Sequence, residues 1–156
     1  MPAVDAANTP PKSAETRGWN FCHAVEVRFA DIDMFGHLNN AKYLTYIESA
    51  RVAYYSAITG LTDPRDFDMT LANVKVDFLR PVFFGQTVHV YTRAGRIGNK
   101  SWTLEHELRD ARTGDLAATA STVIVHFNHE TGKSLPLDEE IVRKIEQFEG
   151  RKLRDR

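Results

Sequence analysis

Apolar and polar residues alternate along much of this chain, and a period of two residues is typical of strands with one buried face. Five segments carry this pattern. They are residues 23–30, 70–82, 87–98, 101–110 and 114–128. Short polar links separate the later segments, and Gly98 with Asn99 is a typical hairpin turn. The sequence therefore predicts consecutive hairpins and an antiparallel sheet.

Residues 39–59 follow a different period. Apolar residues recur there at every third or fourth position, without an internal glycine or proline, which predicts a helix of about five turns that ends at Gly60. The recurring residues are Leu44, Ile47, Ala50, Tyr54 and Ile58. A second helix is predicted over residues 137–150, with Asp138 at its start.

These elements predict an α+β fold in which a five-stranded antiparallel sheet wraps around one long central helix, because that helix must cover a whole face of the sheet. A single helix leaves sheet surface uncovered, so side-by-side dimerisation is expected. The length of 156 residues fits one domain. We expect this domain over residues 19–149, between a disordered N-terminal tail of residues 1–18 and a charged C-terminal tail of residues 150–156.

Composition excludes several classes of protein. Hydrophobic residues make up 42% and charged residues 26%, as in an ordinary globular protein. The net charge of −1 provides no general attraction to nucleic acid or to an anionic membrane surface. No apolar run has the length of a membrane span or of a signal-peptide core. Cys22 is the only cysteine, so no disulfide can form within the chain, and a cytoplasmic location is expected.

Chemically active residue types are concentrated where the first strand meets the long helix, in the sequence FADIDMFGHLNNAKYLTYIESAR of residues 29–51. An Asp-x-Asp pair alone arises by chance. The spacing Asp-x-Asp-x-x-Gly-His-x-Asn-Asn, followed by Tyr43, Glu48 and Arg51, is specific. Together with the segments DFLRPVFFGQTVHV and GRIGNKSWTLEHEL, it resembles the 4-hydroxybenzoyl-CoA thioesterase-like branch of the hotdog-fold acyl-CoA thioesterases. The resemblance covers about residues 22–130.

The resemblance implies hydrolysis of an acyl-CoA or acyl carrier protein thioester, without a cofactor, in a homodimer or tetramer. It assigns the catalytic carboxylate to Asp33 and the group that polarises the thioester carbonyl to the backbone N–H of Asn40. The physics agrees with the second assignment, because the first N–H groups of a helix lack internal partners and lie at its positive end. The carboxylate would attack the carbonyl directly or deprotonate a water.

Three motif residues allow two interpretations each, and a fourth is expected to be structural. Asp33 could be a turn or N-cap carboxylate instead of a catalytic one. Gly36 either leaves room for the approaching thioester or is an ordinary turn glycine. His37 either orients Asp33 or a water, or caps the turn. Asp31 is expected to be structural, through bonds to the backbone amides of the turn.

Two further interpretations concern the acidic residues. A glutamate on the central helix is catalytic in other hotdog thioesterases, but Glu48 could pair with Arg51 and is expected to be structural or to support the site indirectly. Asp31, Asp33 and His37 could supply metal ligands. Neither a two-histidine-one-carboxylate set nor a zinc helix motif accompanies them, so no metal is expected.

The chemical groups of an acyl-CoA substrate predict which residues bind it. The phosphates of coenzyme A favour Arg and Lys at an exposed rim, and we expect Arg80, Lys100 and Ser101 to bind them. A solvated charged hairpin explains Lys100 and Ser101 equally well. Tyr43 is expected to line an apolar slot for the acyl chain along the helix, although core packing would also place an aromatic residue there.

Two other functions compete with hydrolysis. An enoyl-thioester hydratase of the same fold also uses Asp and His near the start of this helix, but with a different spacing. A non-catalytic acyl-CoA-binding module would need the slot without the chemistry, and the presence of Asp33 argues against it. Release of free thiol distinguishes hydrolysis from both alternatives.

Overall fold

The computed structural model describes residues 8–11, 13 and 15–154. The strands are β1 (Cys22–Glu26), β2 (Met69–Phe78), β3 (Thr87–Ile97), β4 (Ser101–Asp110), β5 (Leu116–Asn128) and β6 (Lys133–Ser134), and the helices are α1 (Asn40–Thr59) and α2 (Glu139–Glu149). Short 3₁₀ turns at Phe29–Asp31 and Pro64–Asp66 precede α1 and β2. Parts of both predicted tails, residues 1–7, 12, 14 and 155–156, lie outside the described residues.

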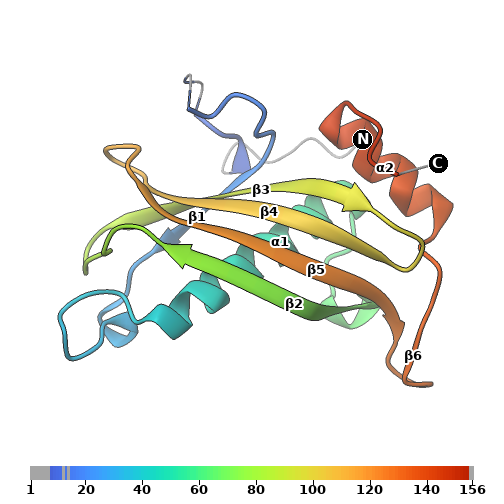
Figure 1. Ribbon diagram of the computed structural model, residues 1–156, viewed down its shortest axis with the longest axis horizontal. Helices are drawn as coiled ribbons and strands as arrows, with labels where there is room; N and C mark the ends of the chain where they lie inside the picture. Colours follow the sequence, from blue (N-terminus) through green and yellow to red (C-terminus); the bar gives the residue numbers. More distant parts are fainter. Residues whose placement is uncertain (1–7, 12, 14, 155–156) are drawn as a thin grey trace.

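The strands form one curved antiparallel sheet in the order β1-β3-β4-β5-β2, with β6 paired to β5 (Figure 1). The hairpins β3–β4 and β4–β5 pair neighbours in sequence, as their short links predict. β2 pairs along its length with β5, from Met69 opposite His126 to Phe78 opposite Ala118. Among the described residues β2 pairs with no other strand, so its second edge is open.

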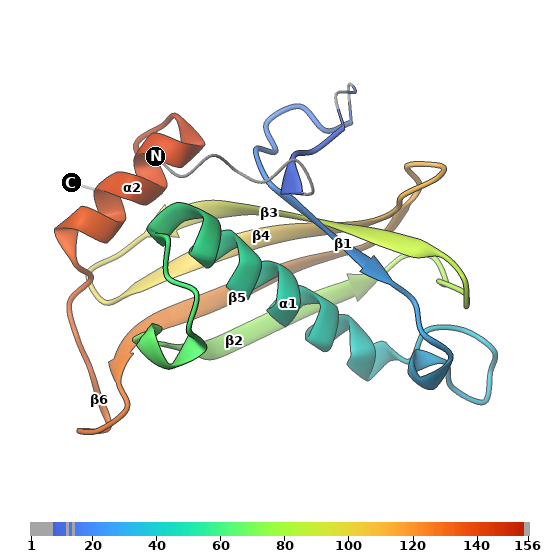
Figure 2. The ribbon, with the colours of Figure 1, turned by 180° about the vertical axis from the view of Figure 1, so that it is seen from behind.

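The sheet curls around α1, which lies across its concave face (Figure 2). The predicted α+β fold, with a sheet wrapped around one long helix, is therefore confirmed. The buried residues of α1 are Tyr43, Tyr46, Ile47, Ala50, Tyr54, Tyr55 and Ile58. Leu44 belongs to the recurring apolar residues that predicted this helix, but it is the one of the five that is exposed. It is exposed because Tyr43 and Ile47 already occupy the turn that faces the sheet, and Leu44 falls on the open flank of the helix.

The ends of two strands differ from the alternating pattern, and one short strand was not predicted. β1 ends at Glu26 because the next residues curl into a 3₁₀ turn, in which the Asp31 carboxylate accepts hydrogen bonds from the backbone and guanidinium of Arg28. β2 ends at Phe78, whereas the alternating segment was predicted to continue to residue 82. β6 is too short to produce a periodic pattern and was not predicted.

The C-terminal helix α2 lies beside the end of β3, at the far end of the molecule from the loop between β1 and α1 (Figure 1). Its last residue, Glu149, is buried, and its carboxylate accepts hydrogen bonds from the Tyr54 hydroxyl and from the Ala94 N–H. After the helix, Arg151 donates to the Ala94 carbonyl and Leu153 is buried. These contacts join α2 and residues 151–153 to both α1 and β3.

The described part of the N-terminal segment packs on β3. Trp19 is buried, its ring meets Tyr91 edge-on at 6.1 Å, and the Arg93 guanidinium lies 4.3 Å from its centroid. The Arg93 side chain also donates to Glu105 at 2.7 Å. Charged and aromatic side chains thus cover this part of the sheet.

A buried polar cluster crosses the middle of the sheet. His106 on β4 lies between Thr92 on β3 and Thr122 on β5, with its Nδ1 3.0 Å and its Nε2 3.1 Å from the two hydroxyl oxygens. Burial, together with the positive charge of Arg51 on α1, lowers the pKa of His106 to about 3. The imidazole is therefore neutral in the folded protein at neutral pH.

Neutral burial of His106 predicts acid sensitivity. A histidine in the unfolded chain binds a proton near pH 6.5, whereas His106 in the folded protein does so only near pH 3. The contribution of His106 to the free energy of unfolding is therefore fully present above pH 6.5 and is lost progressively as the pH falls toward 3. The slope contributed by one such group is about 1.4 kcal/mol per pH unit. The free energy of unfolding, measured in urea, should therefore fall less between pH 7 and pH 5 in His106→Gln than in wild type. His129→Gln, at an exposed position, should keep the wild-type loss, and an unchanged slope in His106→Gln would contradict the prediction.

Candidate active site

The loop of residues 27–39, called the motif loop below, closes one end of the curved sheet (Figure 2). Backbone hydrogen bonds tie it to the link between β2 and β3: Leu38 N–H donates to Val82 at 2.7 Å, and Val27 N–H donates to Gln86 at 3.0 Å. A hollow of about 330 Å³, called the motif hollow, opens beside this junction. It is lined by His37, Leu38, Asn40, Tyr43, Phe78, Leu79, Arg80 and Pro81.

Asp31 anchors the motif loop to α1. Its buried carboxylate accepts hydrogen bonds from the Arg28 guanidinium at 2.9 Å and from the Tyr46 hydroxyl at 2.7 Å. Its carbonyl oxygen accepts the Asn39 N–H at 2.9 Å. The bonds from Arg28, assisted by Tyr46, lower the pKa of Asp31 to about 2 in spite of its burial. Asp31 is therefore structural. Its carboxylate accepts most of its hydrogen bonds from side chains rather than from several backbone amides of the turn, as had been expected.

Asp33 lies in a tight turn of the same loop. One carboxylate oxygen accepts the Phe35 N–H at 2.9 Å, and the other has no hydrogen-bond partner among the described residues. The backbone of Asp33 also donates to the His37 carbonyl at 3.1 Å and accepts the Gly36 N–H at 3.0 Å. Asp33 is thus held by its backbone with one oxygen available, although within a single chain it is not among the residues that line the motif hollow.

Gly36 has a φ of +85°, a left-handed conformation that side chains other than glycine adopt with strain. A Cβ atom added at this position would meet no protein atom within 4 Å. Conformation, rather than crowding within the chain, therefore accounts for the glycine. Next to it, the His37 ring lies 6.4 Å from the Phe35 ring and nearly parallel to it, and it borders the motif hollow.

Asn40 is the first residue of α1, and Asn39 caps the helix by accepting the Ala41 N–H at 3.0 Å on its side chain. The N–H of Asn40 has no acceptor among the described residues. It therefore remains a free donor at the positive end of a 20-residue helix, beside the motif hollow.

The wall opposite the helix start comes from the end of β2 and the link that follows it. The Phe78 ring meets the Tyr43 ring edge-on at 4.9 Å, and the exposed Arg80 guanidinium lies 3.3 Å from the Asp115 carboxylate. Arg80 and Tyr43, predicted from far apart in the sequence, thus share one hollow with His37 and Asn40. Sequence reasoning missed Leu38, Leu79 and Pro81, because no periodic or chemical signal marks apolar residues in a loop as lining residues.

Lys100 and Ser101 are not brought to the motif hollow within one chain. They form the β3–β4 turn, where Ser101 pairs with Val125, at the end of the sheet where β2 begins. The motif hollow lies at the opposite end, where β2 finishes at Phe78. Their predicted contact with phosphate stays a prediction.

Glu48 is exposed on α1, and its carboxylate lies 3.8 Å from the mostly buried Arg51 guanidinium. The pair expected from the sequence is present, at a distance too long for a hydrogen bond. Both residues border a separate hollow of about 200 Å³ between α1 and the first residues of β2, with His129 on its rim. Glu48 therefore lies apart from the residues that line the motif hollow.

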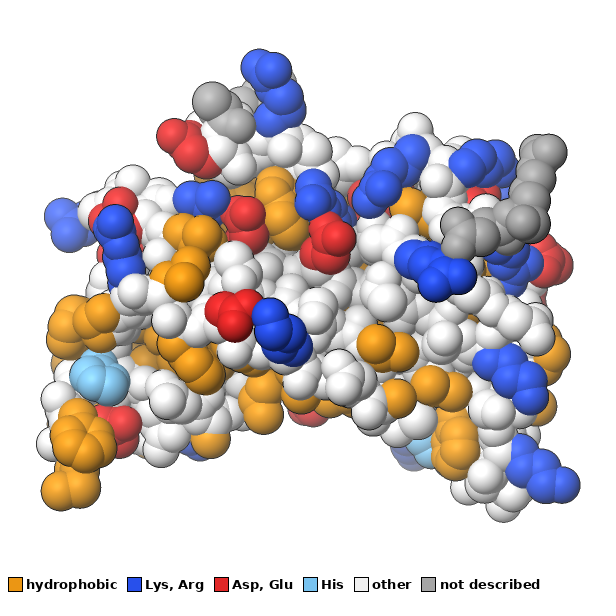
Figure 3. All heavy atoms as spheres, in the orientation of Figure 1, with side chains coloured by type: hydrophobic (Ala, Val, Ile, Leu, Met, Phe, Trp, Pro, Cys, Tyr) orange, Lys and Arg blue, Asp and Glu red, His pale blue; other side chains and the backbone are white. Residues whose placement is uncertain are grey.

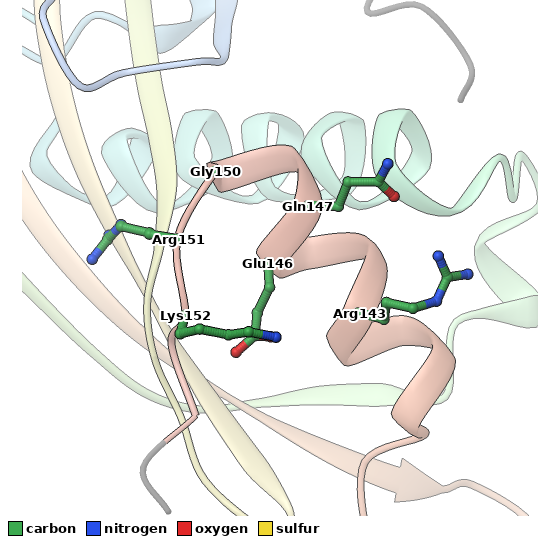
Figure 4. Close-up of a pocket in the computed structure, with 6 residues that line it drawn as sticks. All are labelled: Arg143, Glu146, Gln147, Gly150, Arg151 and Lys152. Carbon is green, nitrogen blue, oxygen red and sulfur yellow. The ribbon is translucent and has the colours of Figure 1, made fainter.

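A larger hollow, of about 490 Å³, lies on α2 and residues 150–152 (Figure 4). Its central Glu146 carboxylate is already occupied, because it accepts the N–H groups of Leu153 and Arg154 and pairs with Lys152. These bonds lower the pKa of Glu146 to about 2. The hollow is thus a groove along a surface ion pair, remote from the motif loop. In the described part of the chain no group of three or more His, Cys, Asp or Glu residues could hold a metal ion.

Hydrophobic side chains gather at the end of the molecule that carries the motif loop (Figure 3). The exposed members from this loop and from the link after β2 are Phe29, Met34, Phe35, Phe83 and Phe84. Met34 is 92% exposed, and the rings of Phe29 and Phe84 meet edge-on at 5.9 Å across the two segments. The motif hollow therefore opens beside an apolar surface.

Comparison with known proteins identifies the family to which this chain belongs. Residues 27–145 match the model of the thioesterase-like superfamily. A thioesterase from Thermus thermophilus, solved in complex with coenzyme A and zinc, superposes with a TM-score of 0.78 at 35% identity, over 88% of this chain and 99% of that one. The chain therefore belongs to the thioesterase-like superfamily, and it is a thioester hydrolase with the hotdog fold that its sequence resembled.

Two relatives match over most of their length. The protein YsmA of Bacillus subtilis strain 168 is 30% identical over 122 residues, which are 78% of this chain and 82% of YsmA. The long-chain acyl-CoA thioesterase FadM of Escherichia coli K12 is 26% identical over 132 residues, which are 80% of this chain and 96% of FadM. The family match itself includes the motif loop, α1 and most of the sheet.

Proposed function

We propose that this protein hydrolyses acyl-CoA thioesters to the free acid and the coenzyme A thiol. The observation that carries the proposal is the free N–H of Asn40 at the start of α1, which borders the motif hollow seven residues after the carboxylate of Asp33. A carboxylate and a directed hydrogen-bond donor are the two groups that thioester hydrolysis requires. A relative that acts on long-chain acyl-CoA and another bound to coenzyme A support the choice of thioester.

Asp33 would act in one of two ways. Its free oxygen attacks the carbonyl carbon, or it takes a proton from a water that attacks instead. In both routes the carbonyl oxygen gains negative charge, which the Asn40 N–H stabilises, and the carbon–sulfur bond then breaks to release the thiol. His37 would orient Asp33 or the water from the rim of the hollow. Gly36 holds the turn between them in its left-handed conformation.

Arg80 would bind a phosphate of coenzyme A, because it is exposed at the mouth of the motif hollow and its only described partner is one aspartate. Tyr43 and Phe78 would form the apolar wall against which the acyl group lies. No cofactor takes part in this scheme. We also propose a cytoplasmic location, in keeping with a single, buried cysteine. No helix in the described part of the chain is long and apolar enough to cross a membrane.

The active form is proposed to be a homodimer, which could pair further into a tetramer. The open edge of β2 is ten residues long, and an unpaired edge is a template for another strand. Exposed apolar residues lie on β2 itself, namely Leu71 and Phe78. A second copy of the chain is the partner that matches both features.

Antiparallel pairing of β2 with the β2 of a second copy would place Phe78 opposite the partner's Met69, since these are the two ends of the strand. The motif hollow contains Phe78, and the smaller hollow beside Arg51 contains Met69. Each motif hollow would therefore adjoin the partner's smaller hollow. The same pairing would bring the partner's Lys100 to the same end as the motif hollow, where a phosphate contact becomes feasible.

Replacing the proposed catalytic carboxylate should nearly abolish turnover. Asp33→Asn keeps the shape of the side chain but removes its charge and basicity, so thiol release from acyl-CoA should fall by ~10²–10⁴. Binding of acyl-CoA should change little. Glu48→Gln is the matched control on the same motif and should keep most of the activity. Near wild-type turnover by Asp33→Asn, with an inactive Glu48→Gln, would show that catalysis had been assigned to the wrong carboxylate.

A proline at position 40 removes the backbone N–H of this residue and so tests its role as the proposed oxyanion donor. Proline is tolerated at the first helical residue, and Asn39, with φ −60° and ψ 131°, already has the extended conformation that a following proline requires. Asn40→Pro should therefore fold but lose about 10²–10³ in kcat, because one oxyanion donor is gone. Asn40→Ala keeps the N–H and should keep most activity. A folded Asn40→Pro enzyme with normal kcat would exclude this donor.

Charge at the open edge of β2 should separate the subunits. Leu71→Asp places a carboxylate at a half-exposed edge position, and sedimentation should show a monomer with reduced thiol release. Gln147→Glu, on the exposed face of α2, should remain dimeric and active. A fully active wild-type monomer in sedimentation would refute the proposed assembly.

A further inference from the structure

Tyr43 combines deep burial with a hydroxyl that has no hydrogen-bond partner among the described residues. The residue is 2% exposed, in the first turns of α1, and its ring is fixed edge-on against Phe78. Two other buried tyrosines of the same helix differ, because Tyr46 donates to Asp31 at 2.7 Å and Tyr54 donates to Glu149. Phenylalanine would fill the same space, so the hydroxyl adds no described hydrogen bond within the protein.

The Tyr43 oxygen is nevertheless not sealed inside the protein. Among the described residues, the only fully enclosed side-chain nitrogen or oxygen without a partner is Nε of Arg154. The small exposed area of Tyr43 therefore includes its hydroxyl oxygen. Since Tyr43 lines the motif hollow, this oxygen is open to whatever occupies the hollow.

The position of Tyr43 on the helix places it on the same face as Asn40, at the border of the same hollow. Residues three apart share one face of a helix, and long side chains lean back toward the helix N-terminus. Tyr43 follows Asn40 by three residues, and both border the same hollow. Two donors without acceptors, one from the backbone and one from a side chain, thus face the same space.

We propose that the Tyr43 hydroxyl donates a second hydrogen bond to the thioester carbonyl oxygen, alongside the Asn40 N–H. This inference rests on the proposed hydrolysis and extends it by naming a second oxyanion donor. Two donors fit the two lone pairs of a carbonyl oxygen and hold it in one orientation as negative charge develops. Phe78 packs against the Tyr43 ring and makes this side of the hollow apolar, which strengthens the hydrogen bond between the Tyr43 hydroxyl and the carbonyl oxygen.

Kinetics of Tyr43→Phe test the proposal. The variant should fold as well as wild type, because the hydroxyl has no hydrogen-bond partner in the described part of the chain. Its kcat for thiol release should fall about 10²-fold with little change in KM. Tyr55→Phe is the matched control. Its hydroxyl also lacks a described hydrogen bond, but it borders a different hollow near the other end of α1, so its kcat should equal that of wild type. A normal kcat in Tyr43→Phe, a loss confined to KM, or a clearly lowered melting temperature would overturn the assignment.

Binding of two unreactive analogues separates this inference from the proposed function. A ketone analogue, with CH₂ in place of the sulfur, keeps the carbonyl, whereas an S-alkyl-CoA thioether lacks it. Tyr43→Phe should bind the ketone roughly 3- to 10-fold more weakly than wild type and the thioether equally well. Equal binding of the ketone would refute the role of Tyr43 even if wild type hydrolyses acyl-CoA. Failure of wild type to release thiol from any acyl-CoA would refute the proposed function, while a selective loss of ketone binding would still support the hydroxyl contact.

Discussion

The hydrogen-bonded ion pair between Arg28 and Asp31, completed by the Tyr46 hydroxyl, is the interaction on which the geometry of the site depends. Tyr46 belongs to α1 and Arg28 to the loop, so the buried carboxylate joins the two. The Asp31 carbonyl also holds the Asn39 N–H, directly before the first turn of the helix. The turn of Asp33 is thereby kept at a constant position relative to the free N–H groups at the helix start. A buried carboxylate with several donors is costly to disrupt, which makes this anchor rigid.

The curvature of the sheet brings the end of β2 close to the motif loop and the start of α1. Because α1 fills the concave face, the end of β2 passes beside the helix start and supplies Phe78 and Arg80 to the motif hollow. The same arrangement leaves the second edge of β2 open and several apolar residues exposed near it. A sheet with one covering helix thus places the motif hollow and an open strand edge in the same molecule, and the proposed homodimer would use that edge.

Local pattern predicted the elements well where one physical period dominates. The long helix was expected from residue 39 and found from Asn40, with Gly60 as its left-handed cap, because a continuous apolar stripe and the final glycine are local signals. Alternation failed after Glu26, where the bond between Arg28 and Asp31 outweighs the strand preference of Val27 and Phe29. Leu44 is exposed although it belongs to the recurring apolar residues, because the helical period alone does not tell which of two adjacent apolar residues faces the sheet.

The sequence by itself determined the five long strands, both helices and the seven-residue spacing from Asp33 to the start of the long helix, because each depends on neighbours within a few residues. Only the tertiary structure decided which distant residues meet. It placed Arg80 and Asn40 at one hollow and Lys100 at the opposite end of the sheet, and it gave the Tyr43 hydroxyl no hydrogen-bond partner among the described residues. Strand register and sheet curvature set these relations, and both arise from packing between segments far apart in the chain, which a local pattern cannot contain.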